Sequence, residues 1–222
     1  MQSTQMIVTC SICYCFLFAF TWLARLYKSN RLFTEGGVPA RNMPLLLASH
    51  MAGICCLAFV PFYLIGWPAF SIVSSSITIE KILFPTPGLI VVFLVGLHTG
   101  SQIRIRQSHV RFSLPFTCSY FAIRLVFICA YELFFRGFLL FNGLLIFGIV
   151  KAITISTGLT ILLHLFTNKK EMWACIPFGI MQCMCCFHLN AVWPAMVIHM
   201  TLSLAYEASA VKYLNNNLKL VK

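Results

Sequence analysis

Residues 114–150 read LPFTCSYFAIRLVFICAYELFFRGFLLFNGLLIFGIV, an almost uninterrupted run of apolar side chains. Within it, only Arg124, Glu132 and Arg136 are charged. An Asp, Lys or Arg side chain at the centre of a membrane helix costs about 2.5–3.5 kcal/mol. A run that is this apolar and still keeps charges in its interior indicates a membrane helix bundle with a polar centre.

The composition of the whole chain supports a membrane protein. Of the 222 residues, 60% are hydrophobic and 9% are charged, and the mean hydropathy is +0.89. Soluble domains carry about 25% charged residues, so this chain has too few to coat a globule. With about 20 apolar residues per span, the predicted fold class is all-α, a polytopic membrane helix bundle with about six to eight transmembrane helices.

Short polar segments separate the apolar runs. Besides the stretch quoted above, the runs cover residues 6–24, 43–70, 82–97, 152–166, 172–187 and 191–205. We interpret 1–110 as N-terminal transmembrane helices and basic loops, 111–210 as a core bundle, and 211–222 as a polar C-terminal tail. Basic loops at 25–41 and 101–111, with a neutral segment between them, predict a non-cytoplasmic N-terminus. The expected location is a membrane crossed several times, the plasma (inner) membrane if the source is bacterial.

The charged residues restrict the chemistry. The net charge is +11, but the cations lie singly or in small groups between apolar runs, which argues against nucleic acid binding. The sequence contains no aspartate, which excludes an aspartic dyad, a Ser-His-Asp triad and an Asp-rich calcium loop. Carboxylate chemistry therefore rests on the five glutamates, which are Glu35, Glu80, Glu132, Glu171 and Glu207.

Eleven cysteines lie in or beside the apolar runs. Two pairs have CxxC spacing, Cys10–Cys13 and Cys183–Cys186, and His188 follows the second pair. This spacing leaves a metal or redox site open, and the alternative is that cysteine serves as a small, polarizable packing residue. Two histidines and one glutamate could also supply three zinc ligands, so the residues alone leave a zinc cofactor open.

Ionisable side chains in the second half of the chain fall at helical spacings. Glu132 and Arg136 are four residues apart and share a helix face, as do His199 and Ser203. Together with His164 on a third helix, they supply the groups for general acid–base catalysis on a water molecule and for stabilising an oxyanion. Each signal also has a structural alternative, since Glu132 and Arg136 could form only an intrahelical ion pair.

Three short segments together resemble the motifs of one family. Residues 131–137 (YELFFRG) resemble an EExxxR-Gly motif, residues 160–164 an FxxxH motif, and residues 199–203 an HxxxN motif. These are the motifs of the CPBP family, the CAAX-protease and bacteriocin-processing (Abi) membrane proteins, which include the Ras-converting type of prenyl-protein endopeptidase. The resemblance covers roughly residues 113–207 and keeps the order of the motifs.

The resemblance implies a role for each matched residue. Glu132 matches the second glutamate and Arg136 the arginine, which orient and stabilise the site. His164 matches the histidine that, with the first glutamate, activates water. His199 and position 203, here Ser203, match the residues that hold the oxyanion. The implied substrate is a peptide or membrane protein in the lipid bilayer, prenylated substrates included, and the implied water activation needs no metal.

The chain departs from the motifs at three positions. Tyr131 replaces the water-activating glutamate, Thr160 replaces phenylalanine, and Ser203 replaces asparagine. A phenol with a pKa near 10 is a poor base for water at neutral pH. Glu132 is rotated by about 100° from position 131 on an α-helix and reaches the same place only with a shift or a π-bulge. Glu207, eight residues after His199, is a further candidate carboxylate.

Three functions stay open from the sequence. The first is an intramembrane endopeptidase that uses His164 with Glu132 to activate water and His199 with Ser203 to hold the oxyanion. The second is a catalytically impaired relative, with Tyr131 in place of the first glutamate, that acts as a membrane binding or immunity-type protein. The third is a small transporter in which the intramembrane charges form a proton or substrate path.

Overall fold

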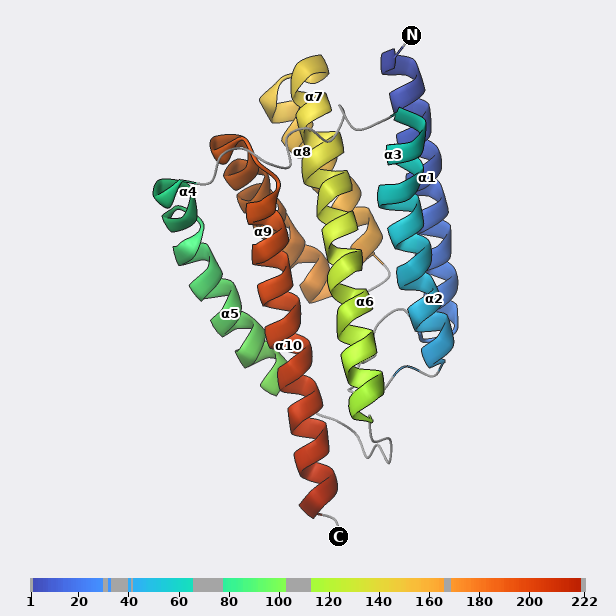
Figure 1. The fold of residues 1–222 in the computed structure, drawn as a ribbon, viewed down its shortest axis with the longest axis vertical. Helices are drawn as coiled ribbons and strands as arrows, with labels where there is room; N and C mark the ends of the chain where they lie inside the picture. Colours follow the sequence, from blue (N-terminus) through green and yellow to red (C-terminus); the bar gives the residue numbers. More distant parts are fainter. Residues whose placement is uncertain are drawn as a thin grey trace.

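The computed structural model describes residues 2–29, 32, 40, 42–65, 78–102, 113–165 and 169–220. Every regular element among them is a helix, which confirms the predicted all-α class (Figure 1). The elements are α1 (Gln2–Leu26), α2 (Met43–Ile54), the π-helix η1 (Cys55–Phe59), α3 (Val60–Ile65), α4 (Ile79–Leu83), α5 (Thr86–Ser101), α6 (Leu114–Glu132), the π-helix η3 (Leu133–Leu139), α7 (Leu140–Phe147), α8 (Ile149–His164), α9 (Lys169–Leu189) and α10 (Trp193–Leu220).

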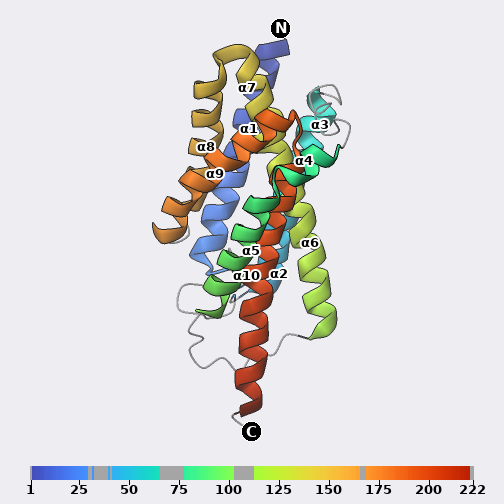
Figure 2. The same cartoon turned by 90° about the vertical axis from the view of Figure 1, so that its left-hand side faces the viewer.

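The long helices run roughly along the longest axis of the molecule (Figures 1 and 2). On one flank α1 packs along α2 and α3, and on the other α5 packs along α10. Between these flanks α6 contacts both α2 and α10, while α8 and α9 pack against each other behind it in Figure 1. The bundle encloses the C-terminal end of α6 and η3, where Glu132 and Arg136 lie, whereas most of the N-terminal part of α6, including Arg124, is exposed or half-buried.

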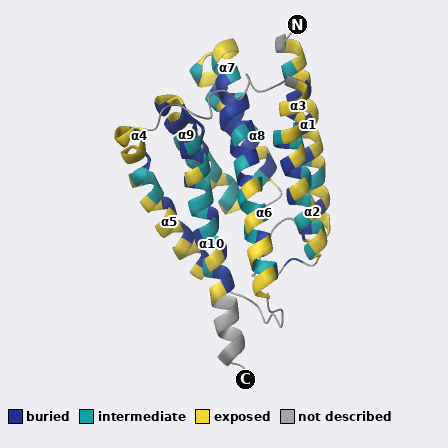
Figure 3. Cartoon of the chain, viewed as in Figure 1, coloured by how far each residue is buried: buried dark blue, intermediate teal, exposed yellow. Residues whose placement is uncertain are grey.

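Four segments are long and apolar enough to cross a membrane, namely Thr4–Leu26, Met43–Leu64, Ile79–Ser101 and Lys169–Leu189. Exposed residues follow the outer faces of α3, α4 and α5 (Figure 3), and many of them are large and apolar. Such a surface is suited to lipid and not to water. The chain is an integral membrane protein. The number of passes stays a prediction, and most of the two basic loops on which the predicted orientation depends lies outside the described residues.

Local sequence signals set several helix ends. The Oδ1 atom of Asn42 caps α2, and the Oγ atom of Ser113 caps α6, each by accepting a backbone N–H of the first turn. Gly148 joins α7 to α8 with a φ of +78°, a conformation that favours glycine. Near the C-terminus, α10 continues to Leu220. Most of the segment 211–222, which we interpret from the sequence as a polar tail, is therefore helical.

A π-helix follows the central glutamate. In η3 the backbone N–H of Leu140 donates to the carbonyl oxygen of Phe135, five residues earlier. Such segments are rare and occur often at functional sites. Because η3 begins after Glu132, the wider turn changes the direction of the residues that follow, Arg136 among them. Tyr131 and Glu132 themselves lie on α6 and keep the α-helical rotation between them.

Two glycines allow α5 to approach α10 closely. A Cβ atom on Gly96 would lie 2.8 Å from the Cβ atom of Ala205 and 2.9 Å from the carbonyl oxygen of Leu202. A Cβ atom on Gly100 would overlap the carbonyl oxygen of Tyr206. Small residues spaced four apart are a common means of bringing membrane helices into contact.

We expect Gly96→Ala to destabilise the protein by about 1–3 kcal/mol, because the added methyl group overpacks the contact with α10. A matched control is Gly158→Ala on α8, since a Cβ atom at Gly158 would meet nothing within 4 Å. Thermal unfolding in detergent measures the difference, at roughly 2–4 °C in Tm per kcal/mol for a chain of this size. Equal Tm values for the two variants would contradict the close approach of α5 to α10.

Candidate functional site

A glutamate, an arginine and a histidine meet in the centre of the bundle. Glu132, the last residue of α6, accepts a hydrogen bond at Oε1 from Nδ1 of His199 on α10, at 2.5 Å. Its Oε2 atom lies 3.3 Å from Nε of Arg136 on η3. The side chains of Glu132 and Arg136 are 0% and 1% exposed, whereas that of His199 is 19% exposed. The histidine is thus the member of this group that reaches an accessible surface.

Two further side chains complete the surroundings of this group. Nε2 of Gln182, on α9, donates to Oε1 of Glu132 at 3.3 Å and to the carbonyl oxygen of Ala195 at 3.1 Å. Nη1 of Arg136 donates to Oγ1 of Thr160, on α8, at 3.1 Å. Oε1 of Glu132 therefore accepts two hydrogen bonds, whereas Oε2 has an ion-pair contact with Arg136 but no hydrogen bond. The group ties α6 and η3 to α8, α9 and α10. Gln182 is not predicted as a site residue from the sequence, where it stands out only as a polar residue within an apolar helix.

A glycine lets α9 approach the arginine. A Cβ atom on Gly179 would lie 3.3 Å from Nη2 of Arg136 and 3.0 Å from Cγ2 of Thr157. One turn further along α9, Cys183 is fully buried, and its thiol donates to Oγ of Ser156 at 3.8 Å. All eleven cysteines are free. Among the described residues, no three His, Cys or Glu side chains come together as a metal-ligand set, and metal-free water activation stays a prediction.

Tyr131 lies beside the Glu132–His199 pair. Its ring meets the His199 ring edge-on, with centroids 5.6 Å apart, and packs 4.5 Å from the ring of Phe135. Its hydroxyl is buried near Thr160 without a well-formed hydrogen bond to it. The side chain at position 131 therefore forms an aromatic wall of the site, and the carboxylate that faces His199 comes from position 132.

His164 and Ser203, also predicted as site residues, lie one helical turn from this group. His164 ends α8, one turn beyond Thr160. Ser203 lies one turn beyond His199 on α10, and its hydroxyl donates to Oε1 of Glu207 at 3.4 Å. The structure thus brings Glu132, Arg136 and His199 into direct contact. The catalytic roles of all five residues stay predictions.

Glu207 belongs to a second buried polar cluster, which links α2, α6 and α10. Its Oε1 atom lies 3.3 Å from Nε of Arg124. Nη1 of Arg124 donates to Nε2 of His50 at 3.1 Å, and Nδ1 of His50 donates to the carbonyl oxygen of Leu46 at 2.8 Å. Because Nδ1 is the donor nitrogen, Nε2 of His50 is the acceptor. The carboxylate of Glu207 thus neutralises the charge of Arg124, and Ser203 belongs to this second cluster through its hydrogen bond to Glu207.

We expect Glu207→Leu to destabilise the protein by somewhat less than the ~3–5 kcal/mol found when one partner of a buried ion pair is removed. The charge of Arg124 is left without a partner, although 24% of its side chain is exposed. The double variant Arg124→Leu/Glu207→Leu should recover part of the loss, because it removes both charges. Thermal unfolding measures each variant against Glu80→Leu, whose parent side chain is exposed on α4. A Glu207→Leu protein as stable as that control would contradict a structural role for the pair.

Comparison with family models supports the resemblance of the motifs. Residues 112–205 match the model described as type II CAAX prenyl endopeptidase Rce1-like. Over this segment, the chain is similar to the Rce1-like family. Comparison of the chain with curated proteins and with solved structures gave no match.

The Rce1-like segment contains the whole of the central group. Glu132, Arg136, Thr160, Gln182 and His199 all lie within the matched residues 112–205. The second cluster extends beyond the match, because His50 lies on α2 and Glu207 lies just after the end of the matched segment. The family supports a protease-like function in a membrane, with a peptide as substrate.

Proposed function

We propose that this chain is an Rce1-like intramembrane endopeptidase in which Glu132 and His199 together activate the attacking water. The observation that carries the proposal is the hydrogen bond between Oε1 of Glu132 and Nδ1 of His199 in the centre of a membrane bundle. A carboxylate that orients a histidine is a recurring arrangement of hydrolytic sites, on many unrelated folds.

The tautomer of His199 follows from this hydrogen bond. A glutamate carboxylate only accepts, so Nδ1 carries the proton and Nε2 is the basic nitrogen. Among the described residues, Nε2 of His199 has no hydrogen-bond partner. Arg136 neutralises the carboxylate from the opposite side, at 3.3 Å, and so keeps Glu132 able to stabilise an imidazolium.

The chemistry is general base catalysis followed by general acid catalysis. Nε2 of His199 takes a proton from water while the water oxygen bonds to the carbonyl carbon of the substrate peptide. The tetrahedral intermediate then collapses, the C–N bond breaks, and the same proton passes from Nε2 to the leaving amine. Glu132 fixes the orientation of the imidazole throughout, and no metal ion takes part in these steps.

This assignment differs from the one implied by the motifs. There, the residue at position 131 and His164 activate water, and the last histidine holds the oxyanion. A tyrosine at 131 removes that base, and the contact between Glu132 and His199 supplies another. We assign the substrate as a peptide segment of a membrane-associated protein, with prenylated substrates as the class to test first.

A second function is favoured by a specific observation. The side chain of Glu132 is 0% exposed, with Oε1 hydrogen-bonded to His199 and Gln182 and Oε2 facing Arg136, so this carboxylate does not reach an accessible surface in the described arrangement. If the histidine cannot act alone, the chain is a catalytically silent relative that binds a membrane partner, as an immunity-type protein does.

The experiment is peptide cleavage by the purified protein in liposomes, with a library that includes farnesylated members. We expect cleavage by the wild type and a loss of about 10²–10⁴-fold in His199→Ala, because the general base is removed. His188→Ala is the control, since His188 is exposed and stacks on Phe84 away from the site. Equal rates for His199→Ala and the control would rule out the proposed base.

A further inference from the structure

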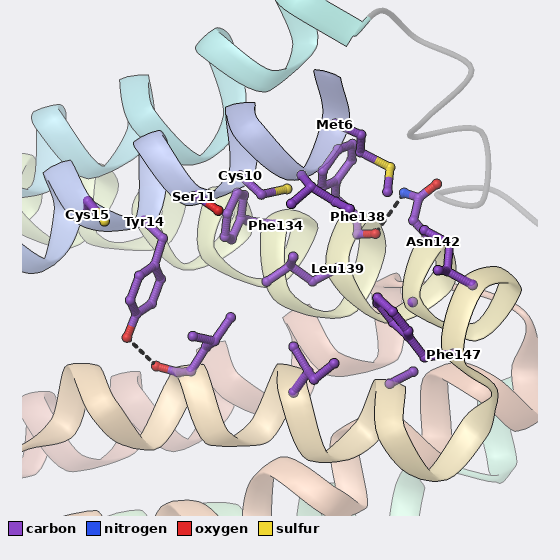
Figure 4. Close-up of a pocket in the computed structure, with 16 residues that line it drawn as sticks. Met6, Cys10, Ser11, Tyr14, Cys15, Phe134, Phe138, Leu139, Asn142 and Phe147 are labelled. Carbon is purple, nitrogen blue, oxygen red and sulfur yellow. Dashed lines mark hydrogen bonds between the residues drawn. The ribbon is translucent and has the colours of Figure 1, made fainter. Parts of the chain in front are cut away.

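An apolar cavity of about 300 Å³ lies between α1, the segment from η3 to α7, and α8 (Figure 4). Cys10 and Tyr14 line it from α1, Phe138 and Leu139 from η3, and Leu159 from α8. Its volume is at the lower end of the range for small-molecule sites, about 300–1,000 Å³. The cavity is therefore large enough to hold part of a small ligand.

The wall of the cavity offers little to a polar ligand. The hydroxyl of Tyr14 donates to the carbonyl oxygen of Leu159 at 2.9 Å, and Nδ2 of Asn142 donates to the carbonyl oxygen of Phe138 at 2.7 Å (Figure 4). These groups are thus already paired within the protein. A bound water needs two to four polar partners, and apolar cavities stay dry. The wall favours an apolar occupant.

The cavity opens on a second exposed apolar surface, formed by α1, α7 and α8. Ile7, Ile146 and Ile155 line it and are 48%, 44% and 40% exposed. Ile7 belongs to the candidate membrane span Thr4–Leu26. The apolar molecules that surround such a surface in a bilayer are the acyl chains of the lipids.

We propose that this cavity binds one acyl chain of a bilayer phospholipid. The chain enters between α1 and the turn from α7 to α8 and packs against Phe134 and Phe138, which lie on either side of Arg136 along η3. The bound acyl chain would fill the space between η3, α1 and α8. This inference does not depend on peptide hydrolysis.

The test uses the full-length protein in liposomes that contain a phosphatidylcholine with a photoactivatable diazirine on one acyl chain. Peptide mapping after irradiation compares half-buried wall residues, Tyr14 and Leu139, with the more exposed Ile12 and Phe16 outside the cavity. A chain held in the cavity labels the wall residues more strongly, although they are less exposed. Labelling that follows exposure alone, strongest at Phe16, would overturn the proposal.

A pair of matched variants sharpens the test. Ser11→Phe places a ring at the cavity from an exposed position of α1, and Thr4→Phe adds the same ring to the same helix outside the cavity. We expect labelling of Tyr14 and Leu139 to fall by about tenfold in Ser11→Phe, the equivalent of ~1.4 kcal/mol of binding, and to stay unchanged in Thr4→Phe. Equal labelling in both variants would overturn the proposal, as would displacement of the labelled lipid by a farnesylated peptide.

Discussion

Replacing Glu132 by glutamine is expected to lower kcat for peptide cleavage by about 10³–10⁴-fold with little change in KM. The comparable Asp→Asn change in a serine protease triad costs about 10⁴-fold, because the histidine loses its correct tautomer. In this chain, a glutamine amide in contact with Nδ1 of His199 can donate as well as accept, so it no longer fixes the proton on Nδ1. It also cannot stabilise the imidazolium that forms when Nε2 takes a proton from water.

The measurement is steady-state cleavage in liposomes, with Glu80→Gln as the matched control. Glu80 is exposed on α4, and its replacement makes the same chemical change outside the site. A Tm close to that of the wild type is needed to show that Glu132→Gln is folded. A folded Glu132→Gln protein that cleaves at the wild-type rate would exclude Glu132 from the mechanism.

Replacing Arg136 by methionine is expected to destabilise the fold by about 3–5 kcal/mol, the range for breaking a buried ion pair from one side. Arg136 and Glu132 are 1% and 0% exposed, so the carboxylate would be left buried without its cation. Thermal unfolding in detergent measures the change, at roughly 2–4 °C in Tm per kcal/mol.

The double variant Glu132→Gln/Arg136→Met is the control for this interpretation. It removes both charges, so it should be more stable than Arg136→Met alone, and the two changes should not add. Additive losses in the double variant would show that Arg136 contributes only through its packing volume and its contact with Thr160.

The sequence predicts the parts of this site that depend on local spacing. The apolar runs predict the helices, and the spacing of Glu132 and Arg136 predicts their ion pair, because residues four apart share a helix face. The resemblance to a family adds His164 and His199, which no local pattern connects to Glu132.

The contacts between distant helices could not be predicted, because they depend on how each helix is rotated about its axis. Glu132 and His199 are 67 residues apart in the chain. Gln182 looks like an isolated polar residue in an apolar helix, and only its two hydrogen bonds show its place in the site. The π-helix after Glu132 likewise has no signal in the sequence.

The most direct test of the central claim compares cleavage of the peptide library by wild type, Glu132→Gln and Tyr131→Glu side by side in liposomes. If Glu132 and His199 activate water, the wild type cleaves, Glu132→Gln does not, and Tyr131→Glu gains nothing that the wild type lacks. A silent wild type together with an active Tyr131→Glu would contradict the claim. That result would identify the chain as an Rce1-like scaffold that has lost its base at position 131 and works by binding.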